Sequence, residues 1–225
     1  MLSALEGAVR ESVHSRIRQR KSIGEVVKGA LDFVLALFAL LFLSPAIAVI
    51  CILLLLEDGR PIIYRHKRIG RNGKEFACLK FRTMRRDADQ ALQAFLSRDE
   101  EARREWEANR KLRRDPRIHR LGRFLRETSL DEIPQFVNVL RGEMSIVGPR
   151  PIVEEELSRY GDQAYCYLSV TPGITGLWQV SGRNRTSYDD RVELDAQYYR
   201  TRSLLLDFKI MWRTVGLLLF ERNGC

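Results

Sequence analysis

The chain has 225 residues and a formal net charge of +9 at pH 7. This length suffices for one sizeable domain with its own core, and the positive balance predicts an anionic partner: nucleic acid, an acidic membrane surface or a phosphorylated substrate. The four cysteines are scattered without a Cys-x-x-Cys pair. This spacing argues against a disulfide framework or a zinc site and favours a reducing cytosolic environment for the polar part of the chain.

Residues 1–27 are rich in arginine and lysine and partly amphipathic, which predicts a basic lead-in able to lie on anionic headgroups. The apolar run that follows, from Leu31 to Leu56, is interrupted only by Asp32, Ser44 and Pro45. One straight helix of this length would measure roughly 39 Å, which exceeds a hydrocarbon core of about 30 Å. A single-pass transmembrane anchor is therefore one interpretation.

Two features favour a helix–break–helix over residues 28–58 instead. Pro45 removes a helical hydrogen bond and clashes with the preceding turn, and the Ser44 hydroxyl can satisfy backbone groups freed there. Lysine and arginine favour the cytoplasmic side of a membrane, and they flank both ends of the run: Arg10, Arg16, Arg18, Arg20, Lys21 and Lys28 before it, and Arg60, Arg65, Lys67, Arg68 and Arg71 after it. The pattern predicts a re-entrant segment that enters one leaflet and returns, with the spanning helix as the alternative.

Residues 59–225 are predicted to form a cytoplasmic, membrane-associated domain of α-rich α/β class around a small sheet. Residues 61–84 contain β-rich runs on either side of Asn72-Gly73, which indicates a hairpin. Residues 87–114 are highly charged and predict one solvated surface helix. Residues 117–126 carry apolar side chains at helical spacing among arginines, which is typical of an amphipathic helix that rests on a membrane or a core.

The later elements are expected to be shorter. Residues 133–145 predict a helix that ends near Gly142, and the prolines of residues 147–153 predict an extended segment. Residues 203–220 are apolar enough for a core or interfacial helix, while the charged side chains among them argue against a full membrane crossing.

The sequence TSLDEIPQF places two adjacent carboxylates, Asp131 and Glu132, directly after a basic run. Ser129 and Glu132 have the spacing of a capping box, and Pro134 is tolerated only in a first helical turn. The pattern therefore predicts a helix that begins near Leu130 or Asp131. On this interpretation the carboxylates cap a helix and need no catalytic role.

The same pattern also fits catalysis. A carboxylate at a helix N-terminus, surrounded by arginines, stays ionised and can act as a nucleophile or a metal ligand. Phosphoryl chemistry uses a divalent ion to neutralise phosphate oxygens, and lysine or arginine to hold the others. The chain supplies candidate phosphate-binding cations in three separate motifs: Lys80 and Arg82, then Arg126, then Arg150.

Taken in order, several long motifs resemble those of the bacterial sugar transferases, which are monotopic phosphoglycosyl transferases: SPAIAVI, KFRTM, DPRIHRLGRFLRETSLDEIPQ, NVLRGEMSIVGPRP and TPGITGLWQVSGR. The resemblance covers roughly residues 28–215, and the fixed order of the motifs makes it specific. WQVSGR and GEMSIVGPRP are similar to the exopolysaccharide-initiating members that move galactose-1-phosphate or glucose-1-phosphate.

The resemblance implies transfer of a sugar-1-phosphate from a UDP-sugar to undecaprenyl phosphate, with release of UMP. Asp131 matches the family's covalent nucleophile, which attacks the β-phosphorus and forms a phosphosugar–enzyme intermediate. Glu132 matches the second carboxylate, which helps to position Mg²⁺ and assists the attack of the lipid phosphate. Asp131 and Glu132 are therefore the expected metal ligands.

Other positions of the family's motifs carry binding roles. Lys80, Arg126 and Arg150 fall where the family places active-site cations. Gln179 and Arg183, in WQVSGR, are expected to contact the nucleotide or the sugar.

The Ser44-Pro45 break matches the point where the family's membrane helix turns back, which implies a location on the cytoplasmic face of the bacterial inner membrane. The implied partners are a UDP-sugar, undecaprenyl phosphate and membrane lipids, with no nucleic acid. A homo-oligomer, contacts with downstream glycosyltransferases, the identity of the sugar and the role of residues 1–27 are left open. The alternative function is a non-enzymatic, membrane-anchored module that binds anionic lipid or nucleic acid.

Overall fold

The computed structural model describes residues 23–109, 112, 114–182 and 187–220. The predicted basic lead-in therefore lies largely outside the described residues. Within the described residues the chain forms two compact units: the first comprises residues 23–42, 65–79 and 134–220, and the second comprises residues 43–64 and 80–133. Helices predominate, as the α-rich prediction requires.

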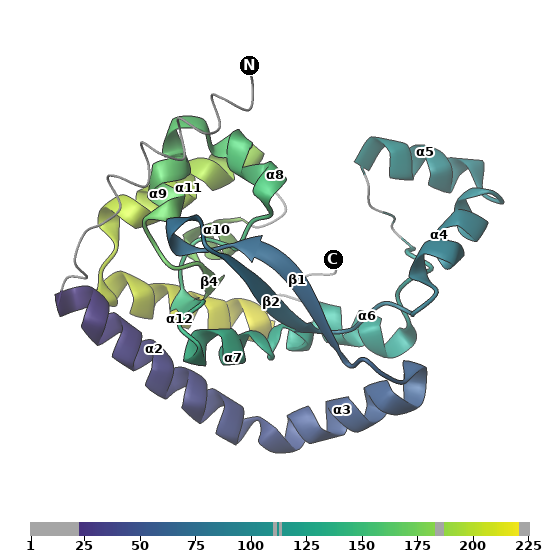
Figure 1. Ribbon diagram of the computed structural model, residues 1–225, viewed down its shortest axis with the longest axis horizontal. Helices are drawn as coiled ribbons and strands as arrows, with labels where there is room; N and C mark the ends of the chain where they lie inside the picture. Colours follow the sequence, from purple (N-terminus) through teal and green to yellow (C-terminus); the bar gives the residue numbers. More distant parts are fainter. Residues whose placement is uncertain (1–22, 110–111, 113, 183–186, 221–225) are drawn as a thin grey trace. The chain divides into compact units, whose positions relative to one another are not determined.

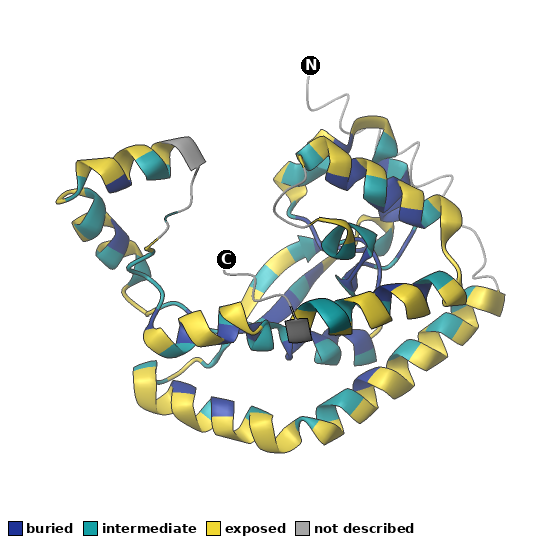
Figure 2. Ribbon diagram, turned by 180° about the vertical axis from the view of Figure 1, so that it is seen from behind, coloured by how far each residue is buried: buried dark blue, intermediate teal, exposed yellow. Residues whose placement is uncertain are grey.

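The apolar run forms two helices, α2 (Ile23–Phe42) and α3 (Ser44–Asp58), which confirms the predicted helix–break–helix. Pro45 occupies the first turn of α3, where its missing N–H removes no helical hydrogen bond. Within the described part of the chain no single helix is long and apolar enough to cross a membrane, whereas the two together are, as a pair bent by 61° at the break. Both helices expose many large apolar side chains, and exposed positions are yellow in Figure 2.

The predicted hairpin is present. Strands β1 (Ile63–Ile69) and β2 (Glu75–Phe81) pair with each other, and the short 3-10 turn η1 (Arg71–Gly73) joins them. Asn72 in this turn has a φ of 61°, a left-handed conformation that asparagine adopts more readily than most residues. The Asn72-Gly73 signal therefore located the turn correctly.

The small sheet is in fact two separate two-stranded sheets among the described residues, which corrects the expectation of one sheet. Strand β3 (Ser145–Val147) pairs in parallel with β4 (Gly173–Thr175), and Ser145 lies opposite Gly173. Beyond β3, Ile152 forms an isolated antiparallel bridge with Ile69 of the hairpin. Pro149 and Pro151 have no N–H group to donate, so a longer ladder cannot form along this segment.

The core of the first unit lies between its helices and strands. Ala36 of α2 is fully buried and packs with Phe76 of the hairpin and Met144. The other helices of this unit follow in chain order: α7 (Gln135–Leu140), α8 (Glu154–Leu157), η3 (Ser158–Gln163), α9 (Ala164–Leu168), α10 (Leu177–Ser181), α11 (Tyr188–Thr201) and α12 (Leu204–Phe220). Helix α7 lies along α2 (Figure 1), and it ends before Gly142 as predicted.

The sequence predicts either a core helix or an interfacial helix for residues 203–220, and helix α12 has a buried face and an exposed apolar face. Ile210 on its inner face packs with Val147 and Tyr198 in the core. Phe208 and Trp212 on the same helix are exposed. One face of α12 thus belongs to the core and another presents apolar side chains outward.

The second unit contains α4 (Ala88–Leu96), α5 (Glu100–Asn109), α6 (Arg120–Glu127) and the 3-10 turn η2 (Leu130–Glu132). The prediction of one helix over residues 87–114 was wrong, because the chain breaks between α4 and α5. The Asp99 carboxylate accepts a hydrogen bond from the Ala102 N–H at 2.9 Å and so caps a new helix. The sequence contained this signal in an aspartate that precedes Glu100 and Glu101.

Candidate active site

Asp131 lies in the short 3-10 helix η2, which begins at Leu130 as predicted, and not in an α-helix. Helix α6 ends at Glu127, Ser129 takes a left-handed conformation with a φ of 57°, and Asp131 follows in η2. The predicted capping box is wrong, since the Ser129 side chain makes no capping hydrogen bond and α7 begins only at Gln135. After this left-handed residue the two carboxylates lie close to Lys80 of β2.

Lys80 joins both carboxylates. Its ammonium donates a hydrogen bond to Glu132 Oε1 at 2.6 Å and lies 3.9 Å from Asp131 Oδ2. Strand alternation explains its position, because Lys80 stands between the buried Leu79 and Phe81 near the end of β2. Glu132 thus takes a partner 52 residues away in the sequence instead of closing a local cap.

Arg126 borders the same site through Thr83. Its Nε donates a hydrogen bond of 2.8 Å to the Thr83 hydroxyl, and its charge lowers the pKa of Asp131. Helix α6 approaches Thr83 closely at Gly122, where a Cβ atom would overlap the Thr83 carbonyl oxygen. Sequence reasoning missed Thr83 and Gly122, although KFRTM contains the threonine.

The sequence predicts that the surrounding cations keep Asp131 ionised. Burial of its side chain opposes this effect. Burial is the largest effect and raises the pKa of Asp131 above its usual value, while Lys80 and Arg126 lower it and Glu132 raises it further. The side chain is 12% exposed, so the ionised form has lost most of its hydration. The cations therefore offset only part of the cost of a buried charge.

The donor set fits a magnesium ion but does not enclose one. The described residues contain no group of three or more histidine, cysteine or acidic side chains able to hold a metal. Asp131 and Glu132 supply two carboxylates from one turn. Mg²⁺ is commonly bound by one or two carboxylates together with substrate phosphates and water, so this pair fits a metal that is completed by substrate.

Arg82 has a different immediate role from the predicted one of phosphate binding. Its guanidinium donates hydrogen bonds to the carbonyl oxygens of Asp58 and Gly59 at 3.0 and 2.9 Å, and it pairs with the Asp58 carboxylate at 2.8 Å. These contacts hold the C-terminal end of α3 against the end of β2. Phosphate binding by Arg82 stays a prediction.

The remaining predicted residues belong to the first unit or lie outside the described residues. Arg150 follows β3 and is partly buried. The Gln179 amide on α10 donates a hydrogen bond to the Ile174 carbonyl at 2.8 Å. Arg183 lies outside the described residues. Within the second unit the structure therefore brings together Lys80, Arg126, Asp131 and Glu132.

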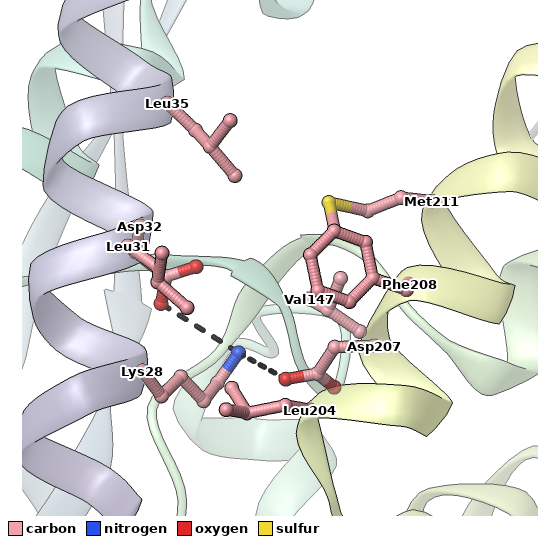
Figure 3. A pocket seen from close by; sticks show the side chains of 9 residues that line it. All are labelled: Lys28, Leu31, Asp32, Leu35, Val147, Leu204, Asp207, Phe208 and Met211. Atoms are coloured by element: carbon pink, nitrogen blue, oxygen red, sulfur yellow. Dashed lines mark hydrogen bonds and ion pairs between the residues drawn. The ribbon is translucent and has the colours of Figure 1, made fainter.

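A second polar cluster, unrecognised in the sequence, lies in the first unit between α2 and α12 (Figure 3). Lys28 Nζ lies 2.8 Å from Asp207 and 3.6 Å from Asp32, inside a small pocket that is otherwise lined by apolar side chains. Asp32 accepts a hydrogen bond from the Ser145 hydroxyl at 2.7 Å, and Asp207 accepts one from Tyr198 at 2.8 Å. These contacts explain why an aspartate interrupts the apolar run near its start.

Comparison with known proteins assigns the chain to a protein family. Residues 23–221 match the family model described as bacterial sugar transferase. The chain belongs to the bacterial sugar transferase family. The predicted family and the prediction of a transferase are thereby confirmed, and the non-enzymatic alternative loses its support.

Similar family members carry informative names. The exopolysaccharide production protein ExoY of Sinorhizobium fredii is 47% identical over 204 residues, which cover 91% of this chain and 90% of that protein. An undecaprenyl-phosphate galactose phosphotransferase of Salmonella typhimurium is 45% identical, over 94% of this chain and 44% of that protein. A UDP-glucose:undecaprenyl-phosphate glucose-1-phosphate transferase of Escherichia coli is 37% identical, over 86% of this chain and 40% of that protein. The chain therefore spans less than half the length of the latter two relatives.

Proposed function

We propose that this protein transfers a sugar-1-phosphate, galactose-1-phosphate or glucose-1-phosphate, from a UDP-sugar to undecaprenyl phosphate and releases UMP. The observation that carries the proposal is the Lys80-bridged pair of Asp131 and Glu132, with Arg126 beside it. The names of the family relatives support the lipid acceptor and the choice of sugars.

The proposed reaction has two displacements at one phosphorus atom. In the first, a carboxylate oxygen of Asp131 attacks the β-phosphorus of the UDP-sugar, and the bond from that phosphorus to the oxygen bridging to the α-phosphate breaks, so that UMP leaves. In the second, a phosphate oxygen of the lipid attacks the same phosphorus, and the bond to Asp131 breaks. The product is a diphosphate that joins lipid and sugar, and the Asp131 carboxylate is regenerated.

The neighbouring side chains have complementary roles in this scheme. Lys80 holds Glu132 and neutralises charge between the two carboxylates, which keeps Asp131 available as a nucleophile. Arg126 is proposed to hold phosphate oxygens at this site, and Arg150 is a separate candidate phosphate-binding residue in the first unit. Mg²⁺ held by Asp131 and Glu132 would neutralise phosphate charge during both displacements.

Membrane association is part of the proposal. The lipid acceptor carries its phosphate at the headgroup plane, while the sugar donor is soluble in water, so one site must meet both. The exposed apolar side chains of α2, α3 and α12 suit insertion into the cytoplasmic leaflet of the bacterial inner membrane. The break at Ser44-Pro45 suits a segment that enters and returns on the same side.

The experiment is a UDP-sugar panel scored by UMP release, with undecaprenyl phosphate present and with Asp131→Asn as the comparison. We expect UMP release with UDP-galactose or UDP-glucose, and its loss by more than a thousandfold in the variant. Without acceptor, the wild type should retain labelled sugar-phosphate and the variant should not. Near-normal turnover by Asp131→Asn at matched protein levels would contradict the covalent mechanism.

A further inference from the structure

The main chain of residues 150–152, which carries Arg150, is held at each residue in the first unit. The Arg191 guanidinium donates to the Arg150 carbonyl at 3.5 Å, and the Arg68 guanidinium donates to the Pro151 carbonyl at 3.3 Å. The Ile152 carbonyl accepts from the Ile69 N–H at 2.9 Å. The orientation of this segment is thus fixed from strand β1 on one side and helix α11 on the other.

Glu156, in the first turn of α8, links the two arginines that hold this segment. Its Oε2 lies 3.7 Å from Arg68 Nη1, and its Oε1 lies 3.7 Å from Arg191 Nη1. The same Oε2 accepts a hydrogen bond from the Val153 N–H at 3.1 Å, which fixes the carboxylate relative to the segment that it supports. One carboxylate therefore lies within ion-pair distance of both guanidinium groups.

The Arg191 end of this bridge is buried. The guanidinium lies over the rings of Trp178 and Tyr188 at 5.0 and 5.3 Å, and its Nε lies 3.9 Å from Asp195. Asp195 accepts a hydrogen bond of 2.8 Å from the buried Tyr160 hydroxyl. Arg191 therefore contacts α8, α10 and α11 from a buried position next to the Arg150 carbonyl.

The charge of Arg150 is coupled to both ends of this bridge. It lowers the pKa of Arg68, second only to burial, and it lowers the pKa of Asp195. A cation near a second arginine is repelled, and it keeps a defined position only where its backbone is held and acidic groups balance the charge. Glu156 and Asp195 supply those acidic groups.

We propose that Arg68, Glu156 and Arg191 are positioning residues that fix the main chain of residues 150–152 and thereby support phosphate binding by the Arg150 guanidinium. The proposal rests on the proposed function, in which Arg150 holds phosphate. In this proposal the three residues act through Arg150 and make no contact of their own with the substrate. Small displacements of a binding group are costly for catalysis, since a shift of about 1 Å can reduce the rate by about a hundredfold.

The test is a double-mutant cycle with Glu156→Gln and Arg150→Ala. Glutamine keeps the size of the side chain but loses the charge that joins the two arginines. We expect Glu156→Gln to lower kcat/KM for UMP release by about tenfold in the wild-type background and by less than about twofold in the Arg150→Ala background. Equal losses in both backgrounds, or no loss in the wild-type background, would overturn the proposal.

A binding measurement covers variants that are too slow to assay. The UDP-sugar that supports wild-type turnover should raise the Tm of the wild type on binding. This increase in Tm should be smaller in Glu156→Gln than in the wild type. In the Arg150→Ala background, Glu156→Gln should not change the increase. Glu155→Gln is the matched control, because it makes the same change at an exposed position of the same helix and should behave as wild type. A loss in Glu155→Gln equal to that in Glu156→Gln would also overturn the proposal.

Different results contradict the positioning role and the proposed function. If the wild type releases no UMP with any UDP-sugar, the proposed function is contradicted. If the wild type is active and Glu156→Gln acts independently of Arg150, only the positioning role is contradicted. If Glu156→Gln lowers the Tm of the unliganded protein substantially, Glu156→Asp replaces it in the test, because aspartate keeps the charge on a shorter side chain. Glu156→Asp should lower kcat/KM less than Glu156→Gln does, and this loss should also disappear in the Arg150→Ala background.

Discussion

Lys80 donates a 2.6 Å hydrogen bond to Glu132, and this contact joins the end of a β-strand to a 3-10 turn 52 residues further along the chain. The same ammonium lies 3.9 Å from Asp131. Two neighbouring carboxylates repel each other, and here one cation from another element relieves the repulsion.

Lys80→Met should therefore reduce kcat/KM for UMP release by at least about a hundredfold, because it removes the 2.6 Å contact with Glu132 and the cation beside Asp131. Lys80→Arg should retain part of the activity. The control is Lys67→Met, which removes an exposed lysine from the other strand of the hairpin. Equal activity of Lys80→Met and Lys67→Met would show that Lys80 has no role in the reaction.

Asp195 should make stability depend on pH between about 4 and 6. Burial is the main cause that raises the pKa of Asp195 to about 6 in the folded protein, from 3.8 as its ordinary value. The folded state therefore binds the proton more tightly than the unfolded state. Its contribution to stability is fully present below pH of about 4 and is lost as pH rises through about 6.

The measurement for Asp195 is the free energy of unfolding of wild type and Asp195→Asn at several pH values. The difference should shift in favour of the wild type by about 2 kcal/mol between pH 7 and pH 4.5. Asp189→Asn on the same helix is the control for a charge change at an exposed position. A difference for Asp195→Asn that is constant over this range would contradict the raised pKa.

Lys28→Met should destabilise the protein, because it leaves the buried Asp207 and the neighbouring Asp32 without their shared cation. Removing one partner of a buried ion pair costs about 3–5 kcal/mol, and the partial exposure of Lys28 reduces the expected loss to about 1–3 kcal/mol. Denaturant unfolding in detergent measures it. Adding Asp207→Asn to Lys28→Met should recover part of the loss, whereas Lys209→Met, at an exposed position of α12, should be neutral.

Gly122→Ala should distort the site from outside it. The new Cβ would overlap the Thr83 carbonyl oxygen, so α6 must shift, and Arg126 shifts with it. We expect a loss of about 1–3 kcal/mol in stability together with reduced activity. Gly216→Ala is the control, since its Cβ would meet no atom within 4 Å and alanine favours the helix. Equal Tm values for the two variants would contradict the tight contact.

The sequence predicted those parts of the fold that depend on the backbone conformation of a few neighbouring residues. The Asn72-Gly73 turn and the break at Ser44-Pro45 depend on the conformations of one or two residues, and both were located correctly. The capping box failed because Glu132 has a stronger partner in Lys80, and spacing within nine residues gives no information about a strand far away in the sequence.

Long-range contacts account for what could not be predicted. The pairing of Lys28 with Asp207 joins residues 179 positions apart, so neither charge had a visible reason in the sequence. Arg82 was chosen for its charge, yet its donors hold the carbonyl groups that end α3. Glu156 and Arg191 gave no signal at all, because their importance depends on which backbone carbonyl groups the fold brings to them.

The Lys28–Asp207 pair has a practical consequence for anyone who wishes to handle this enzyme without detergent. Cutting away α2 to obtain a water-soluble fragment would also remove the counter-ion of Asp207 and the small Ala36 side chain that covers Phe76 and Met144. Such a fragment should precipitate or unfold unless Asp207 is made neutral and the uncovered patch is made polar, because the apolar helix α2 is a structural part of the first unit.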